Sequence, residues 1–349
     1  MGQLLNDPSS VVFDMATGVT LAHPHLQQLG EYATIATTES PLERVAIVSG
    51  GGSGHEPAHW GYVGKGMLDA ACAGQVFTSP PVEQILDAIH VLDRRNDHAG
   101  VLLVVKNFAG DVMNFGMAAE TARNEGVPIA VVTVNDDVSI SDPSSRRGVA
   151  GAVLLHKIAG AMAVRGAPLV EVKRTATRAV RNMASYGIAT SPCVLPGAKG
   201  PSFELADDEM ELGIGIHGER GTATVPLQRA GQMCELVFAA LREQLPSLRS
   251  SRILLLVNGM GGTPSLELYL VFAEIHRLAS GVGATVAIGL VGNFMTSLNM
   301  VGFSSTILLL DDELEELLRA EHHATAFPDL TRQQPSSQRA AFRQGCRDR

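Results

Sequence analysis

The stretch RVAIVSGGGSGHEP, Arg44 to Pro57, decides the fold class and locates a candidate site. A run of apolar β-forming residues stops at three consecutive glycines, and His55 and Glu56 follow at once. The pattern predicts a buried strand that leads into a bare loop, because glycine permits positive φ and a close approach of a ligand to the backbone. A tight turn without a ligand is the alternative. Neither G-x-x-x-x-G-K-[ST] nor G-x-G-x-x-G occurs here, so the stretch does not indicate a nucleotide loop.

Apolar runs of strand length alternate along the chain with segments of helical period. The runs are VAIVS (45–49), VLLVVKN (101–107), PIAVVTV (128–134), ILLLVNG (253–259), ATVAIGLVG (284–292) and STILLL (305–310). The helical segments are DVMNFGMAAETARNEG (111–126), LLHKIAGAMAVRG (154–166) and LELYLVFAEIHRLAS (266–280). Because the strands are apolar throughout, we predict an α/β fold in which helices cover both faces of each sheet.

A segment rich in proline and glycine, IATSPCVLPGAKGPS at 188–202, predicts a boundary between two α/β domains. We expect the first domain at residues 1–187, with the glycine-rich loop, and the second at 188–330. The ligand site is expected at the interface between these domains. The polar and basic residues 331–349 are expected to form a mobile tail.

Composition limits the partners and the compartment. Of the 349 residues, 45% are hydrophobic and 18% are charged, which is typical of a compact soluble protein. The net charge of -9 and the lack of basic runs argue against nucleic acid and anionic membranes as partners. Cys72, Cys193, Cys234 and Cys346 lack metal-ligand spacing, so we expect no metal site and no disulfide framework. Without an evident leader or membrane-spanning stretch, a cytoplasmic protein is expected.

Loops that follow the apolar strands bring titratable groups to the carboxyl ends of the strands, where ligands bind in α/β sheets. Lys106 can donate a proton and Asp111 can accept one. An aspartate that opens a helix is often only an N-cap, and this alternative stays open for Asp111. The adjacent Asp136 and Asp137 are interpreted as a solvated, turn-forming pair.

Of the 11 histidines, only His55 and His217 lie in glycine-rich loops. His217 follows an alternating segment in MELGIGIHGERG (210–221). Without a neighbouring cluster of Cys, His and carboxylate at ligand spacing, nucleophilic or acid–base chemistry is favoured over metal binding, and a purely structural role is the alternative. The residues therefore predict an α/β enzyme or ligand-binding protein with His55, Asp111 and His217 in a small polar pocket.

Several long motifs resemble, in the same order, those of the K subunit, or K domain, of dihydroxyacetone kinases. They are SGGGSGHEPAHWGYVGKGMLDAACAGQVFTSPP (49–81), VVKNFAGDVMNFGMAAE (104–120), DDVSISDPSSRRGVAGAVLLHKIAGA (136–161), PSFELADDEMELGIGIHGERG (201–221), NGMGGTPSLELYLVF (258–272) and GNFMTSLNMVGFSSTILLLDDELEELL (292–318). The resemblance extends over residues 5–325.

This resemblance implies the dihydroxyacetone-binding part of a two-component kinase. In such a protein the imidazole of His217 adds to the ketose carbonyl and forms a covalent hemiaminal. His55 assists this addition, and Asp111 acts as general base on the hydroxyl that is phosphorylated. The residues expected to line the site are Gly52, Ser53, Gly54, Ser79, Pro80 and Lys106.

The resemblance also places the phosphoryl donor on a separate L subunit. The donor is either ATP or a bound ADP with Mg that a phosphotransferase-system protein phosphorylates again, so no cofactor is expected on this chain. A homodimer is implied as well. Alternatives are a kinase subunit for another short ketose such as erythrulose, a dihydroxyacetone sensor without kinase activity, and an independent isomerase or aldolase. Asp111 disfavours the sensor, because a sensor needs no base, and Asn299 in TSLNM replaces an aspartate of the family pattern.

Overall fold

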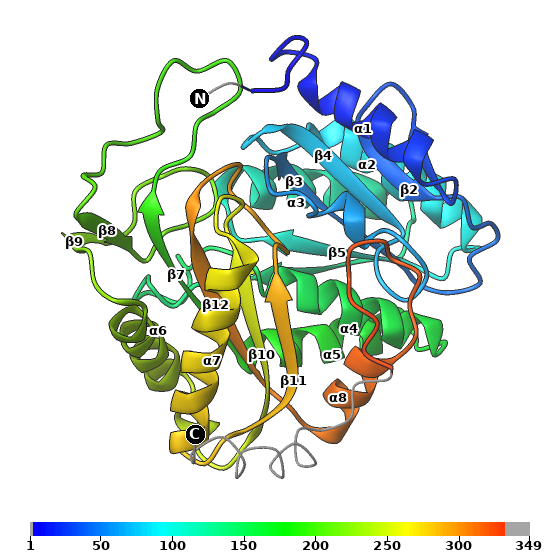
Figure 1. The fold of residues 1–349 in the computed structure, drawn as a ribbon. Helices are drawn as coiled ribbons and strands as arrows, with labels where there is room; N and C mark the ends of the chain where they lie inside the picture. The colour runs from blue at the N-terminus through cyan, green and yellow to red at the C-terminus, as the bar shows by residue number, and fades with distance from the viewer. Residues whose placement is uncertain (1–2, 332–349) are drawn as a thin grey trace.

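The computed structural model describes residues 3–331, which form two six-stranded sheets with helices between and outside them (Figure 1). The first sheet has the order β1-β2-β4-β3-β5-β6. Its strands are β1 (Leu26–Leu29), β2 (Thr34–Thr37), β3 (Ala46–Ser53), β4 (Ala70–Val76), β5 (Val101–Lys106) and β6 (Ile129–Val134). Strands β3 to β6 are parallel, whereas β1 and β2 form an antiparallel edge. The carboxyl ends of β3 and β5 therefore lie side by side.

The second sheet has the order β11-β10-β12-β7-β8-β9. Its strands are β7 (Met183–Ser191), β8 (Glu209–Leu212), β9 (Ala223–Pro226), β10 (Arg252–Gly259), β11 (Thr285–Gly292) and β12 (Val301–Leu309). Only the pair β10 and β11 is parallel within this sheet, as far as the described strands go. The predicted α/β fold with two sheets is confirmed, and each of the six apolar runs forms a strand.

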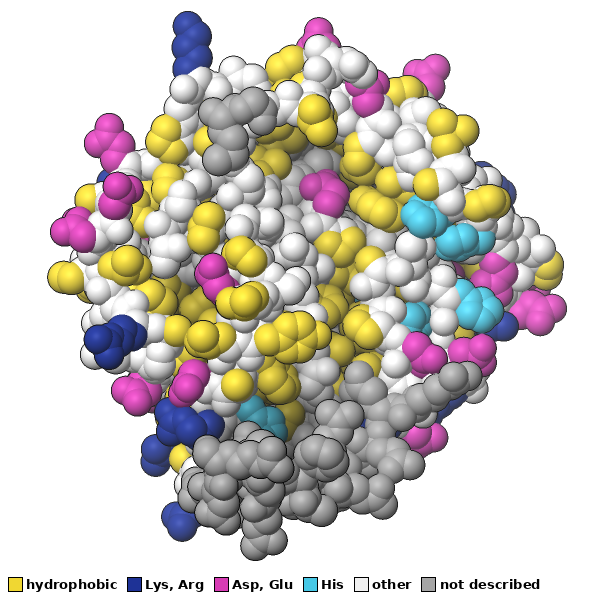
Figure 2. Space-filling view, viewed as in Figure 1, with side chains coloured by type: hydrophobic (Ala, Val, Ile, Leu, Met, Phe, Trp, Pro, Cys, Tyr) yellow, Lys and Arg dark blue, Asp and Glu magenta, His cyan; other side chains and the backbone are white. Residues whose placement is uncertain are grey.

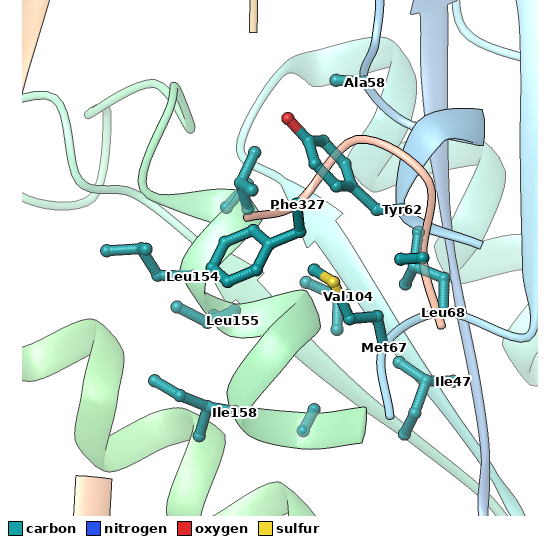
Figure 3. Close-up of a cluster of buried hydrophobic side chains, with 14 of the residues drawn as sticks. Ile47, Ala58, Tyr62, Met67, Leu68, Val104, Leu154, Leu155, Ile158 and Phe327 are labelled. Atoms are coloured by element: carbon teal, nitrogen blue, oxygen red, sulfur yellow. The ribbon is translucent and has the colours of Figure 1, made fainter. Parts of the chain in front are cut away.

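Helices form three layers around these two sheets. The helices are α1 (Val11–Ala22), α2 (Val82–Arg95), α3 (Ala109–Asn124), α4 (Ala152–Val164), α5 (Leu169–Arg181), α6 (Ala230–Gln244), α7 (Ser265–Gly281) and α8 (Asp312–Arg319), with 3₁₀ turns at Trp60–Tyr62 and Pro246–Leu248. Buried side chains of α2 and α3 join one face of the first sheet, and those of α6 and α7 join the outer face of the second. Helices α4, α5 and α8 share one core with residues of both sheets. Figure 3 shows part of this shared core, where Leu154, Leu155 and Ile158 of α4 face side chains of the first sheet.

Strand β3 continues through the three glycines to Ser53, so the expected end of the strand at Ser49 is wrong. Gly50 pairs with Cys72 of β4, and a Cβ atom on Gly50 would lie 2.3 Å from the Cys72 carbonyl oxygen. The glycines therefore serve close approach of neighbouring backbone, and the loop begins only at Gly54.

The expected domain boundary at residue 188 falls inside β7, which starts at Met183 and pairs with β12 and β8. A division of the chain into two domains stays a prediction. Residues 332–349 of the expected tail, with Cys346, lie outside the described residues. The described cysteines, Cys72, Cys193 and Cys234, are free and buried. Within residues 3–331, no helix has the length and apolar character required to cross a membrane.

The interpretation of Asp136 and Asp137 as a solvated turn is wrong, because both side chains are buried. Asp136 accepts hydrogen bonds from the backbone nitrogens of Val149 and Gly151, at 2.8 and 2.9 Å, just before α4. The Ser185 hydroxyl of β7 donates to the same carboxylate. Burial raises the pKa of Asp136 to about 6, against the opposing effect of these donors. The aspartate thus joins the end of β6, the start of α4 and the second sheet.

Gly160 in α4 and Gly116 in α3 provide a matched test of how closely α4 packs. A Cβ atom on Gly160 would lie 2.4 Å from the Cα atom of Met67, whereas one on Gly116 would meet no described atom within 4 Å. We expect Gly116→Ala to raise the free energy of unfolding by about 0.5–1 kcal/mol, the usual gain in a helix. Gly160→Ala should lower it by about 1–3 kcal/mol, because the Met67 backbone has to move. Urea denaturation measures both, and equal stabilisation would contradict the packing described.

Candidate functional site

The structure brings the sequence-predicted titratable residues together at the carboxyl ends of β3 and β5. The rings of His55 and His217 lie 4.8 Å apart between centroids, at an angle of 75°. Lys106 Nζ lies 3.2 Å from Asp111 Oδ2. A Cβ atom on Gly110, in the first turn of α3, would lie 3.3 Å from the Ser79 Cβ atom, which places Ser79 beside Asp111. We call His55, Ser79, Lys106, Asp111 and His217 the candidate site.

The His217 ring is enclosed by other rings. Phe108 meets it edge-on at 4.2 Å between centroids, and Phe77 does so at 5.5 Å. Burial, with smaller contributions from the charges of Lys106 and Arg147, lowers the pKa of His217 to about 3. The ring is therefore neutral at neutral pH, and its unprotonated nitrogen has a lone pair available for chemistry.

Arg147 fixes the turn that carries His217. Its guanidinium is 2.6 Å from Asp137 and 2.9 Å from Glu219, and it donates to the carbonyl oxygen of Gly213 at 2.7 Å. The other carboxylate oxygen of Glu219 accepts a hydrogen bond from the His217 backbone nitrogen at 2.7 Å. Arg147, which follows β6, thus contacts both Gly213 and Glu219, on either side of His217 in the turn after β8. A planar guanidinium is suited to this, because it can donate to several acceptors at once.

His55 has a defined tautomer. Its Nδ1 lies 2.8 Å from the carbonyl oxygen of Thr296, which can only accept, so Nδ1 carries the proton and Nε2 has the lone pair. This Nε2 atom is buried and finds no hydrogen-bond partner within residues 3–331. Burial above all, then the charges of His217 and Lys106, holds the pKa of His55 well below 6.5. His55 therefore presents a neutral acceptor at the candidate site.

The loop of His55 is held by backbone pairing with a segment that follows β11. The Thr296 nitrogen donates to the His55 carbonyl oxygen at 3.1 Å, and the Leu298 nitrogen donates to that of Gly54 at 2.7 Å. The Thr296 hydroxyl donates to the Glu56 carbonyl oxygen at 2.9 Å. Gly54 has a φ of 97°, which a residue with a side chain rarely adopts. This backbone junction joins the two halves of the chain beside the histidine pair.

Asp111 is not a helix cap, so that alternative is wrong. Helix α3 begins at Ala109, and its N-cap, Phe108, makes no side-chain cap hydrogen bond. Asp111 lies in the first turn with its side chain 4% exposed and directed at Lys106. Its Oδ2 atom accepts no hydrogen bond from the part of the chain that the structure describes. This oxygen, which Lys106 approaches as an ion-pair partner at 3.2 Å but to which no described group donates a hydrogen bond, can accept a proton.

Lys106 ends β5 and is fully buried. Its ammonium donates to the Gly50 carbonyl oxygen at 3.0 Å. A Cβ atom on Gly51 would lie 2.1 Å from Lys106 Nζ, and one on Gly52 would lie 2.6 Å from the Thr78 nitrogen. The glycines of β3 thus make room for the lysine and for the chain that leads to Ser79.

The remaining expected lining residues differ in how their polar groups are used. The Ser53 hydroxyl donates to the Gly74 carbonyl oxygen at 2.7 Å, and the Pro80 carbonyl oxygen accepts from Asn114 Nδ2 at 2.8 Å. The buried Ser79 hydroxyl has no partner among the described residues. Ser79 is therefore the residue of this group with an unused polar atom at the candidate site.

Two buried histidines adjoin the candidate site and were not predicted. His59 Nε2 lies 3.1 Å from Lys106 Nζ, and His59 Nδ1 lies 2.9 Å from His156 Nε2. His59 follows His55 by four residues in the same motif, and His156 with Lys157 interrupts an otherwise apolar helix. These are signals that could have drawn attention to both residues.

The surroundings of the candidate site are mostly apolar. A cleft of about 640 Å³ lies on the other side of the His55 loop; its lining includes Ser53, Gly54, Glu56, Thr296 and Leu298. Figure 2 shows apolar side chains along the hollow in the middle of the face seen in Figure 1, with an acidic side chain at the hollow and the Lys and Arg side chains near the outline of the view. In residues 3–331, no three or more His, Cys, Asp or Glu side chains group in a way that could hold a metal ion.

Comparison with known proteins gives matches over nearly the whole chain. A family model described as the Dak1 domain matches residues 17–326. The chain is 44% identical over 317 residues to the dihydroxyacetone-binding subunit DhaK of PTS-dependent dihydroxyacetone kinase 1 from Listeria innocua, a match that covers 90% of this chain and 95% of the relative.

Two solved structures have the same fold. The dihydroxyacetone kinase operon co-activator Dha-DhaQ has a TM-score of 0.86 at 35% identity, and the match covers 90% of this chain and 97% of that one. The dihydroxyacetone kinase of C. freundii has a TM-score of 0.85 at 37% identity, with coverage of 94% and 60%. The chain thus matches some relatives over their full length and others over about three fifths of it.

Stability should depend on pH through the His217 ring. The unfolded chain takes up a proton on this ring below the ordinary pKa of 6.5, whereas the folded protein does so only near a pKa of about 3. The free energy of unfolding therefore falls as the pH drops from 7.5 to 5.0, by about 2 kcal/mol from this ring. Urea unfolding at both pH values should show a loss about 2 kcal/mol smaller in His217→Gln. Equal losses would contradict a buried neutral ring.

Proposed function

The chain belongs to the Dak1 family, and on that basis we propose that it is the dihydroxyacetone-binding subunit of a dihydroxyacetone kinase. One observation carries the proposal: His55 Nε2, Ser79 Oγ and Asp111 Oδ2 are all buried without hydrogen-bond partners in the described part of the chain. Buried polar atoms are normally paired, so these three are suited to a small polar ligand. Dihydroxyacetone offers one carbonyl and two hydroxyl groups to them.

His217 forms the covalent bond to the ketose in this proposal. The lone pair of its unprotonated nitrogen attacks the carbonyl carbon, and the carbonyl oxygen takes up a proton as the hemiaminal forms. The other ring nitrogen gives up its proton, so the addition is neutral overall. His55, with its Nε2 lone pair and a ring centroid 4.8 Å from that of His217, is placed to carry this proton. A polyol such as glycerol has no carbonyl and forms no such adduct.

Asp111 acts on the hydroxyl that is phosphorylated. Its Oδ2, which accepts no hydrogen bond from a described residue, takes the hydroxyl proton, the hydroxyl oxygen bonds to phosphorus, and the bond from phosphorus to the donor breaks. The donor is held by an L subunit that docks over the candidate site and excludes water. Dihydroxyacetone phosphate is the product. ATP or a phosphotransferase relay as the donor, erythrulose as a substrate, and a homodimeric assembly remain predictions.

A ketose sensor without kinase activity is the second candidate function. It is favoured by the likeness to a solved structure that is named an operon co-activator. The sensor requires the histidines of the candidate site but not a base at the hydroxyl. The buried ion pair of Lys106 and Asp111, in which Oδ2 accepts no hydrogen bond from a described residue, supports the kinase instead.

Replacing His217 with Ala should abolish the covalent adduct. Intact-mass analysis under non-denaturing conditions, or a crystal structure, of the protein incubated with dihydroxyacetone should show one added ketose on the unchanged protein and none on His217→Ala. His323→Ala is the control, because the His323 side chain is 62% exposed and lies outside the candidate site. An adduct that persists in His217→Ala would remove His217 from its role.

Replacing Asp111 with Asn should separate binding from turnover. With an L subunit and its phosphoryl donor, Asp111→Asn should form dihydroxyacetone phosphate ~10²- to 10⁴-fold more slowly than the unchanged protein, since a general base is lost. Adduct formation should persist. The chain without an L subunit should give no product with ATP. Rapid product formation by the chain alone would overturn the two-component proposal, and adduct without turnover under any donor would establish the sensor.

A further inference from the structure

A line of four buried titratable side chains runs from the candidate site into the interior. It starts at Asp111, continues through Lys106 to His59, and ends at His156 on α4. Their exposed fractions are 3%, 0%, 6% and 0%. Asp111 and Lys106 belong to the candidate site, whereas His59 and His156 have no role in the chemistry proposed above.

Counting protons assigns the hydrogen bonds from Lys106 inward. An ammonium group carries three protons and accepts none. One proton of Lys106 goes to the Gly50 carbonyl oxygen, and a second goes to His59 Nε2, which must therefore be an unprotonated acceptor. The His59 proton is then on Nδ1 and is donated to His156 Nε2. It follows that the proton of His156 is on Nδ1. The third ammonium proton of Lys106 has no hydrogen-bond acceptor among the described residues, although Asp111 Oδ2 lies 3.2 Å from Nζ as an ion-pair partner.

The line is closed at its inner end. His156 Nδ1 is buried and has no hydrogen-bond partner in the described residues, so protons cannot leave by this route through them. Burial, followed by the charge of Lys106, lowers the pKa of His156 to about 3 and that of His59 well below 6.5. Because both rings are neutral and the inner end of the line at His156 is blocked, the two histidines orient Lys106 rather than conduct protons.

We propose that His59, held by His156, is a positioning residue that keeps one ammonium proton of Lys106 from Asp111, so that Lys106 meets Asp111 Oδ2 as an ion-pair partner without donating a hydrogen bond, and this oxygen can take the proton of the substrate hydroxyl. This inference rests on the proposed role of Asp111 as base. Lys106 Nζ lies 3.2 Å from Oδ2 itself, within ion-pair distance, yet no described residue donates a hydrogen bond to this oxygen. Without His59, that ammonium proton would lose its acceptor in a buried place and turn to the carboxylate, where it would compete with the hydroxyl.

The ring tautomers test the arrangement without any turnover. In protein labelled with ¹⁵N-histidine, NMR should show both rings neutral with the proton on Nδ1, unchanged between pH 6 and 8. Most neutral histidines in water prefer the other tautomer, so the result is diagnostic. Lys106→Met should release His59 from its role as acceptor and shift its ¹⁵N signals. A proton on His59 Nε2, or titration of either ring in this range, overturns the proposal.

Kinetics with the L subunit test the consequence. His59→Leu removes the acceptor and should lower kcat by roughly tenfold or more, the scale at which partners that orient a functional group act, with KM and adduct formation little changed. His59→Gln places an amide oxygen near the position of Nε2 and should restore most of the rate. In the Asp111→Asn background, His59→Leu should cost nothing further, because both act on the same step. The exposed His323→Leu is the control.

The outcomes separate this proposal from the function it rests on. If Asp111→Asn keeps its rate, Asp111 is not the base and the positioning role falls with it, whatever the tautomers are. If Asp111→Asn is slow but His59→Leu keeps its rate, only the positioning role is overturned. An equal loss in His59→Leu and His59→Gln would show that packing, not the acceptor, matters, and would also overturn it.

Discussion

The backbone junction between the loop of Gly54 to Glu56 and the segment of Thr296 to Leu298 is the constraint on which the candidate site depends. Two segments more than 200 residues apart exchange main-chain hydrogen bonds there. The same Thr296 carbonyl oxygen sets the tautomer of His55. Because main-chain bonds have fixed geometry, the orientation of this ring follows from the register of the junction rather than from the flexible reach of a side chain.

Exclusion of water governs the electrostatics of the site. Burial is the first cause of the lowered pKa of His55, His59, His156 and His217 alike. Near Lys106 and Arg147, an added positive charge on any of these rings would be costly. The site thus keeps its imidazoles neutral and its lysine as the cation. A neutral imidazole with a lone pair is what nucleophilic addition to a carbonyl requires.

Local pattern was sufficient to predict the apolar strands, the helices between them, and the candidate residues His55, Asp111 and His217. It was misleading where short-range composition and tertiary contact disagree. Asp136 and Asp137 have the composition of a turn, yet distant partners at Arg147 and Ser185 bury them. Strands β1, β2, β4, β7, β8 and β9 were not predicted. Four of them, β1, β2, β8 and β9, have four residues each, which carry little periodicity. The pairing of His59 with His156 depends on contact across 97 positions, which no single motif contains.

Helix α4 has no face directed to water, since every residue from Ala152 to Ala163 is buried. It completes the core of the first sheet and that of the second together. A cut that removed either sheet would expose a largely apolar helix, so we expect neither half to fold on its own. In the longer kinase of C. freundii, 94% of this chain matches 60% of the protein. Such a relative therefore contains both sheets and the helices between them as one module. Recombination can add to such a module at its ends, but it cannot divide it.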